Sequence, residues 1–496
     1  MMKYLFSSLR IVLAFVFVFW ILSVIKFFFE APLSILFGFS VVLSLLFLKK
    51  TLLIGLIKWI NNHKILFSIF MVIYQIVILI STAWMIRSDA ASVYRAATHL
   101  QEVSITEAYF SRYPNNLLLL IYERAFFNIF GLKSALWVMQ FLNIVYLNTS
   151  LFLIYKLSKK HFSLQAGNIT YFLSVFLIGF SPQFIAMYTD IMLLPIIVFQ
   201  LYLMVDLFKG KKGIKGVVGL ALVSAVGILI RPTSLILIIA IVIVFLLRHF
   251  SRHSLNKVIL LILVIIGLYK SFDYLKSQQT IVNLKKEDSI TALAYIDLGL
   301  TYTGADQIDF QRGLSMFVRD GESRFSNRVV KKDIQRRIDE YTPISFINHI
   351  ILKFNNTVKD GTLQWVYRSP LPGDNLTILN PLLKYTENNI FAKIVRKFFI
   401  EIDSKYFSFY KYSQQIVWTI ASLGLLLNIR YIRKDDINDT LLLTIFGGLM
   451  FLMIFEGGKT RYLIQFLPEI LLVSSLGLSA FLQKMLPDKD NISVFR

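Results

Sequence analysis

Long apolar stretches constrain the fold of this chain more than any other feature. A membrane-spanning helix needs about 20 mainly apolar residues, and twelve stretches approach that length, although some of them are short. These stretches lie near residues 7–27, 33–48, 65–85, 134–155, 166–186, 191–208, 213–229, 232–248, 257–274, 411–430, 438–455 and 462–482. Hydrophobic residues form 56% of the 496 residues, more than one soluble domain can bury. The sequence therefore predicts an all-α polytopic membrane protein with about twelve transmembrane helices.

Basic residues predict how these helices are oriented. Lys and Arg collect in every second loop, as they do in the cytoplasmic loops of membrane proteins. They are Lys49, Lys50, Lys58 and Lys64, then Lys156, Lys159 and Lys160, then Lys209, Lys211, Lys212 and Lys215, then Arg248, Arg252 and Lys257, and finally Arg430, Arg433 and Lys434. Both termini are then expected in the cytoplasm, and the apolar run after Lys3 and Arg10, which lacks a cleavage site, is expected to remain as the first span. The lipid bilayer thus accounts for the formal net charge of +22 without a nucleic-acid partner.

Polar segments divide the chain into four expected regions. Residues 1–64 contain two N-terminal spans and a cytoplasmic loop, and residues 65–274 form a membrane core with its first outer loop at 86–134. Residues 275–408 form an extracytoplasmic, mainly helical region. Residues 409–496 contain the last spans and a cytoplasmic tail.

Two helices are expected outside the membrane. The stretch 116–130 is too short for a span and carries Glu123 and Arg124 in its middle, which favours a helix lying on the outer membrane surface. A second helix begins after Thr342, a suitable cap, and stops before Gly361. One face of that helix is formed by Ile347, Ile350, Ile351 and Phe354.

Charged residues at the outer ends of the predicted spans are the candidate site. Asp89 follows the third apolar run by about one helical turn, close to the bilayer core, where a charge is costly. The other candidates at this level are Asp190, Arg231, Glu456, Lys459 and Arg461. Acids gathered there can accept protons, and cations can hold phosphate. The chain has no cysteine and its outer histidines, His99 and His349, lie far apart in sequence, so no cofactor is expected and a divalent metal is compatible but not indicated.

Each candidate also has an explanation without catalysis. Asp89 can cap a helix that begins at Ala90, because Asp is a favoured N-cap residue. Asp190 can offset the dipole of the span that it opens, and Arg231 can extend to the membrane interface. Headgroup anchoring is the simple explanation for Lys459, Arg461 and Tyr462.

In their order along the chain, these residues resemble the GT-C superfamily of polyprenyl-phosphate-sugar glycosyltransferases. The similar branch contains protein O-mannosyltransferases and lipid A aminoarabinose transferases, which are glycosyltransferase family 39-like. The matching motifs are Ser88-Asp89, Tyr113-Pro114 to Phe130-Gly131, Tyr188-Thr189-Asp190, Arg231-Pro232-Thr233 and Arg461-Tyr462. Two positions depart from the family. Ala90 stands where a second acid is common, and Tyr113 stands where the aminoarabinose branch has Lys, for which Arg112 can substitute.

The resemblance implies a GT-C-like fold and an inverting glycosyltransferase at the outer face of the cell membrane. It would move a sugar from a polyprenyl-phosphate donor to a cell-envelope acceptor, which is a glycopolymer, a lipid or a protein. Asp89 would be the general base, and the donor phosphate would be held by Arg231, Lys459, Arg461 and Arg112. The other expected site residues are Asp190, Tyr188, Tyr113, Arg95, Glu456 and Tyr462. The alternatives are a polysaccharide polymerase or ligase, and a flippase or transporter of lipid-linked glycans.

Overall fold

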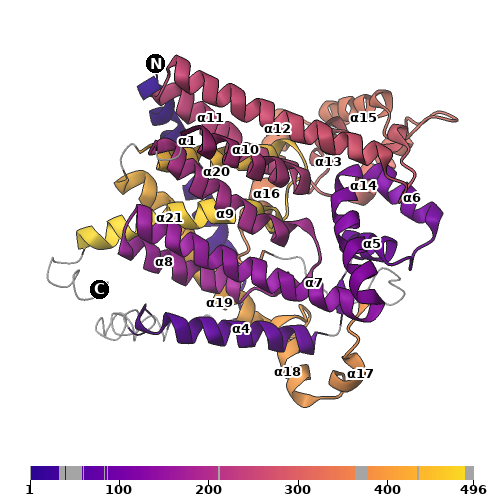
Figure 1. The fold of residues 1–496 in the computed structure, drawn as a ribbon, viewed down its shortest axis with the longest axis horizontal. Coiled ribbons are helices and arrows are strands. Elements are labelled where there is room, and N and C mark those ends of the chain that lie inside the picture. The colour runs from indigo at the N-terminus through magenta and orange to yellow at the C-terminus, as the bar shows by residue number, and fades with distance from the viewer. Residues whose placement is uncertain are drawn as a thin grey trace.

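The computed structural model shows a bundle of long helices with shorter helices gathered at one end (Figure 1). The described residues are 2–32, 40, 59, 61–82, 84–86, 88–210, 213–363, 378–432 and 435–485. Within them, eight helices are long and apolar enough to cross a membrane. These are α1 (Met2–Phe29), α4 (Lys64–Ser81), α7 (Leu117–His161), α9 (Thr189–Phe208), α10 (Gly213–Ile230), α12 (Arg252–Gln278), α20 (Asp436–Ile454) and α21 (Leu467–Met485). The chain is therefore an all-α polytopic membrane protein, as the sequence predicts.

The expected number of twelve spans is not confirmed. The predicted span 33–48 lies almost wholly outside the described residues. In place of the predicted span 166–186, α8 (Leu164–Ser174) continues for one π-helical turn only, and α11 (Leu235–Arg248) is also short. The helix α19 (Phe407–Tyr431) is long enough but is not among the eight, and it carries several buried polar side chains. Some basic residues of the predicted cytoplasmic loops also lie outside the described residues, namely Lys49, Lys50, Lys58, Lys211, Lys212, Arg433 and Lys434.

Close helix packing forms the centre of the bundle. The helices α19 and α21 approach so closely that a Cβ atom at Gly477 would lie 2.1 Å from the Gly424 carbonyl oxygen. Only glycine permits this approach, because any side chain would collide with backbone. Leu425 and Leu471, on the two helices, are fully buried in the main core.

Short outer helices gather at the end of the bundle opposite to the start of α1 and the end of α21 (Figure 1). They include α5 (Ser88–Ala97), α6 (Val103–Arg112), α13 (Ala292–Gly299), α14 (Gln307–Ser315) and α15 (Asn327–Glu340). The helix α16 (Pro343–Val358) lies further in, among the long helices, and contacts α1 and α20. Two more, α17 (Leu383–Thr386) and α18 (Ile390–Phe399), lie beside the end of α4. The long predicted polar region therefore folds mainly as helices.

A small clamp holds the chain where it leaves α4. The strand β1 (Trp84–Ile86) pairs with β2 (Ile378–Leu379) in antiparallel orientation. The Asn380 side chain donates to the carbonyl of Thr82 at 2.5 Å, and Arg396 of α18 donates to the carbonyl of Ser81 at 2.9 Å. These bonds satisfy carbonyls that the end of a helix leaves open. They fix the segment that leads into Asp89.

Both expected outer helices form, with differences in burial. The backbone of α7 is non-helical at Gly131, where φ is 69°, so the predicted surface helix ends there. Glu123 within it is 0% exposed rather than solvated, because α5 packs against α7. Thr342 and Ser345 form the capping box of α16. The predicted apolar face of α16 is partly exposed at Ile347 and Ile351, and its buried residues are His349, Lys353, Thr357 and Val358.

Candidate active site

Asp89 lies in the first turn of α5, directly after β1. Ser88 before it has a φ of 49°, a left-handed conformation that residues with a side chain seldom adopt. The helix begins at Ser88, and the Asp89 carboxylate makes no hydrogen bond within the described part of the chain. The alternative in which Asp89 caps a helix that starts at Ala90 is therefore not supported.

The surroundings of Asp89 make its carboxylate a better proton acceptor. Burial raises the pKa of the Asp89 carboxyl above its ordinary value. The charge of Arg461 opposes this increase of the pKa, and so does that of Lys459, whereas Glu456 adds to it. A carboxylate with a raised pKa is more basic and accepts a proton more readily near neutral pH.

Three tyrosines and an asparagine form one side of the site. The Asn116 side-chain nitrogen donates to the hydroxyl oxygen of Tyr109 at 2.9 Å and to that of Tyr188 at 3.3 Å. The Tyr113 ring lies 5.2 Å from the Tyr109 ring, between centroids. Burial, followed by the charge of Asp89, raises the pKa of Tyr188 to about 12. Its hydroxyl therefore stays protonated at neutral pH and can donate a hydrogen bond.

An ion pair with Asp190 orients Arg231. The Arg231 guanidinium donates to the Asp190 carboxylate, which joins the end of α10 to the first turn of α9. Pro232 opens a short 3₁₀ helix directly after Arg231, and the Thr233 hydroxyl donates to the Gln465 side chain. Asp190 is only 2% exposed and contacts Arg231 from behind.

The segment between α20 and α21 carries Glu456 and Arg461. The Tyr462 hydroxyl donates to the Glu456 carboxylate, and the Arg461 guanidinium lies 5.0 Å from the centre of the Tyr462 ring. Lys353 of α16 donates to the carbonyl of Phe455 at 2.7 Å, directly before Glu456. These contacts hold an acid and a guanidinium on one short segment.

Together these segments enclose a cavity of about 450 Å³. Its size is in the range of small-molecule binding sites. The predicted site residues that line it are Asp89, Tyr113, Tyr188, Arg231, Glu456, Arg461 and Tyr462. Within the described residues, no group of three or more His, Asp or Glu side chains is suited to hold a metal ion.

One side of the cavity is formed by residues of α13, of α14 and of the segment before α13, and we call this side the outer wall. Its residues are Ile290, Ala292, Ala294, Tyr295, Leu298, Gln307 and Phe310. The wall contains one amide side chain and no charged side chain, whereas the opposite side contains two acids and two guanidinium groups. The cavity therefore has two chemically different halves.

Four predicted site residues do not line the cavity: Arg95, Arg112, Asp190 and Lys459. The Arg112 guanidinium lies 5.2 Å from the centre of the Phe325 ring, behind the outer wall. Arg95 donates to the Leu100 carbonyl at 3.1 Å on the surface. Lys459 is exposed and acts on the site through its charge.

Several lining residues were not predicted from the sequence. Tyr109, Asn116 and Thr233 stand within or next to the motifs Tyr113-Pro114 and Arg231-Pro232-Thr233, so their positions gave a usable signal. Gln465 and the residues of the outer wall belong to no motif. Only the tertiary fold reveals them.

The fold and the site define a polytopic helical membrane protein with a cavity at one end of its bundle. The chain belongs to the family described as conserved hypothetical integral membrane protein, whose model matches residues 30–481. No curated protein matches the chain. Among solved structures, the chain is similar to ArnT from Cupriavidus metallidurans in the apo state, with a TM-score of 0.35 and 14% identity over 85% of this chain and 77% of that one. The structure of the same ArnT bound to undecaprenyl phosphate gives a TM-score of 0.35 and 15% identity over 85% of this chain and 78% of that one.

Proposed function

We propose that this protein transfers a sugar from a polyprenyl-phosphate donor to a hydroxyl group of a cell-envelope acceptor, and that the reaction takes place in this cavity at the outer face of the cell membrane. One observation carries the proposal. Asp89, Arg231 and Arg461 come from three distant parts of the chain and line one cavity. A proton acceptor and two guanidinium groups in one cavity are the groups that transfer from a phosphate ester requires.

The proposed reaction is a single displacement. The Asp89 carboxylate takes the proton of the acceptor hydroxyl while that oxygen forms a bond to the anomeric carbon. The bond from the anomeric carbon to the phosphate oxygen breaks, and its electron pair stays on the phosphate. Arg231 and Arg461 stabilise the negative charge that grows on that oxygen. Attack opposite to the leaving group inverts the anomeric configuration.

The proposal assigns a task to each region of the chain. The membrane regions 65–274 and 409–496 would hold the donor, and the region 275–408 would cover the acceptor. The apolar residues Phe451 and Leu452 line the cavity at the end of α20, where the polyprenyl chain can leave it.

Replacement of Asp89 tests the proposed function. Asp89→Asn keeps the size of the side chain but removes the proton acceptor, so transfer should fall by about 10²–10⁴-fold, the usual effect of a positioned base. Binding of undecaprenyl phosphate, the probe for the donor, should persist. The measurement is transfer by the purified protein from a panel of polyprenyl-phosphate sugars, with Asp320→Asn, an exposed residue of the outer region, as the matched control.

The alternatives give different results in this assay. A flippase would move the donor without cleaving it, so no sugar would leave the lipid in either protein. A polymerase or ligase would use the same arginines but would transfer a preassembled glycan from its lipid. Normal transfer by Asp89→Asn would disprove the proposed base.

A further inference from the structure

The distribution of charge in the cavity distinguishes its two halves. The charged side chains among the described lining residues are Asp89, Arg231, Glu456 and Arg461, and none of them belongs to the outer wall. The outer wall presents Tyr295 and Phe310 as aromatic side chains and Gln307 as its amide. Two guanidinium groups therefore serve one half, and the other half has no cation of its own.

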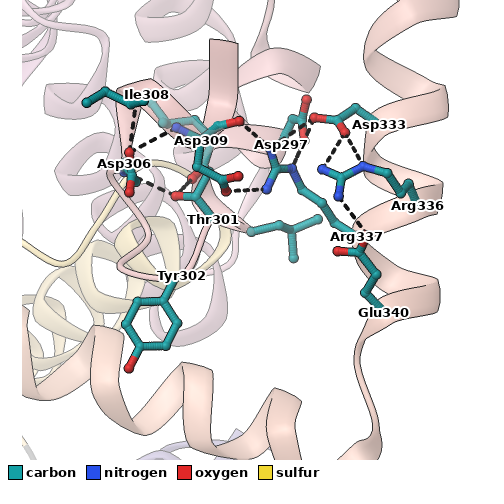
Figure 2. Close-up of polar contacts among 12 residues, drawn as sticks. Asp297, Thr301, Tyr302, Asp306, Ile308, Asp309, Asp333, Arg336, Arg337 and Glu340 are labelled. Carbon is teal, nitrogen blue, oxygen red and sulfur yellow. Dashed lines mark hydrogen bonds and ion pairs between the residues drawn. The ribbon is translucent and has the colours of Figure 1, made fainter. Parts of the chain in front are cut away.

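The outer wall is rigidly supported from behind. The ring of Phe310 stacks on that of Phe325 at 6.3 Å between centroids. A side chain at Gly313 of α14 would collide with the carboxylate of Asp333 at 2.3 Å, so α14 and α15 are in direct contact. Buried Arg337 of α15 then joins these helices by ion pairs (Figure 2).

These ion pairs converge on one guanidinium group. Arg337 donates to Asp297 of α13 at 2.9 Å and to Asp309 of α14 at 2.6 Å (Figure 2). Asp333 lies one turn before Arg337 and pairs with it at 3.1 Å. Because Asp297 is fully buried, the pair fixes α13 against α15 and so fixes the outer wall.

The outer wall faces the carboxylates of the site. Burial raises the pKa of the Tyr295 hydroxyl, and the nearby charges of Glu456 and Asp89 add to the increase of the pKa. Tyr295 lines the same cavity as both acids. No hydrogen bond of its hydroxyl is found among the described residues, so the hydroxyl can bond to a ligand.

We propose that the outer wall binds an uncharged sugar ring of the acceptor, and not a phosphate-bearing acceptor. This inference rests on the proposed function and names the acceptor class of the same site. The apolar face of a sugar ring can pack on Tyr295 and Phe310, while Gln307 and the Tyr295 hydroxyl bond to its hydroxyls. One acceptor hydroxyl would then point to Asp89, which takes its proton.

An anionic acceptor does not suit this half of the cavity. A phosphate against the outer wall would be buried near Asp89 and Glu456, and no residue of the wall carries a cation to pair with it, which costs free energy. The guanidinium groups of Arg231 and Arg461 are occupied by the donor phosphate in the proposed reaction. Charge therefore selects a neutral acceptor.

Ligand binding measured without turnover tests this inference. We would record saturation-transfer NMR spectra of the full-length protein in a detergent that has no sugar headgroup. The probes are methyl β-D-glucopyranoside as the neutral ring and glucose 6-phosphate as its anionic counterpart. The variants are Tyr295→Ala and Gln307→Ala, and the control is Tyr302→Ala, a residue of the same region that is 73% exposed and points away from the ion-pair cluster (Figure 2).

The neutral glucoside should bind to the wild type and to the Tyr302→Ala control. Its affinity should fall by about tenfold in Tyr295→Ala, the value of one lost aromatic contact, and to a smaller extent in Gln307→Ala, which retains the ring. Unchanged glucoside binding in both variants, no binding to the wild type, or tighter binding of glucose 6-phosphate would overturn the inference. Undecaprenyl phosphate binding is measured in parallel with Arg461→Ala. If that lipid binds equally well without Arg461, the proposed donor site fails, whatever the glucoside results are.

Discussion

Asp190 and Arg231 form one ion pair, yet only Arg231 lines the cavity. A buried carboxylate that holds a guanidinium restricts its rotamers and directs its other N–H groups. In the proposed function, Arg231 therefore binds the donor phosphate and Asp190 orients Arg231. The family resemblance implies phosphate binding by Arg231 but gives Asp190 only a place in the site, with no task of its own.

Replacement of Asp190 separates these tasks. Asp190→Asn removes the charge that orients Arg231, so the Kd for undecaprenyl phosphate should increase by about tenfold, or about 1.4 kcal/mol. The value of kcat at saturating donor should change much less. A titration of the purified variant with undecaprenyl phosphate checks this, with Asp320→Asn as the control. A loss of kcat with unchanged Kd would instead place Asp190 in the chemical step.

At the scale of secondary-structure elements, α16 connects the outer wall of the cavity to the segment at the end of α20. Lys353 is fully buried, and its ammonium donates to the carbonyls of Gly299 at 2.9 Å, Met453 at 3.0 Å and Phe455 at 2.7 Å. The first carbonyl ends α13, and the other two lie at the end of α20. Loss of one N–H donor would therefore loosen the segment of Glu456 relative to the outer wall.

This junction predicts a pH dependence. Burial lowers the pKa of Lys353 to about 8, although the charge of Glu456 opposes the decrease. Activity should therefore fall as pH rises through about 8, because the neutral amine has one N–H fewer. The pKa of Lys353 is lower in the folded protein than in the unfolded chain, so the unfolded chain binds more protons as the pH rises above about 8. The free energy of unfolding should therefore increase over this pH range. Between pH 7 and pH 10, the rate of sugar transfer should therefore decrease while the temperature of thermal unfolding increases.

The variant Lys353→Met provides the comparison for this prediction. It keeps much of the packing but cannot titrate, so its lower activity should stay level through the same pH range. Burial lowers the pKa of His349, the neighbouring titratable group on α16, so His349 is already neutral at pH 7 and does not titrate in this range. An alkaline decrease in activity that persists in Lys353→Met would assign the titration to another group.

Local patterns predicted the elements better than they predicted the contacts between them. Thr342-Pro343 and Phe130-Gly131 mark real helix boundaries because capping and glycine conformations are local properties. The apolar spacing of α16 gave no indication that Lys353 is buried, since its partners are carbonyls of distant helices. Gln465 and Phe310 could not be predicted for the same reason.

At the scale of the whole molecule, basic side chains from several loops gather at the end of the bundle opposite to the cavity. Opposite to the cavity, Arg248 of α11 pairs with Asp436 and Asp439 of α20, and Arg10 of α1 also pairs with Asp439. Lys64 at the start of α4 donates to Asn168 of α8 at 2.6 Å. Basic residues from distant loops thus meet at one end, as the positive-inside rule predicts for the cytoplasmic end.

This arrangement predicts the membrane topology, and cysteine labelling tests it. The chain has no cysteine, so each introduced thiol is unique. Asp320→Cys lies on an exposed turn between α14 and α15, near the cavity end, and Lys160→Cys is exposed at the opposite end of α7. A membrane-impermeant thiol reagent added to intact cells should label Asp320→Cys, whereas Lys160→Cys should react only after the membrane is opened. The reverse pattern would place the cavity in the cytoplasm, where a lipid-linked donor would have to be used on the inner leaflet, and the proposed outer-face reaction would be wrong.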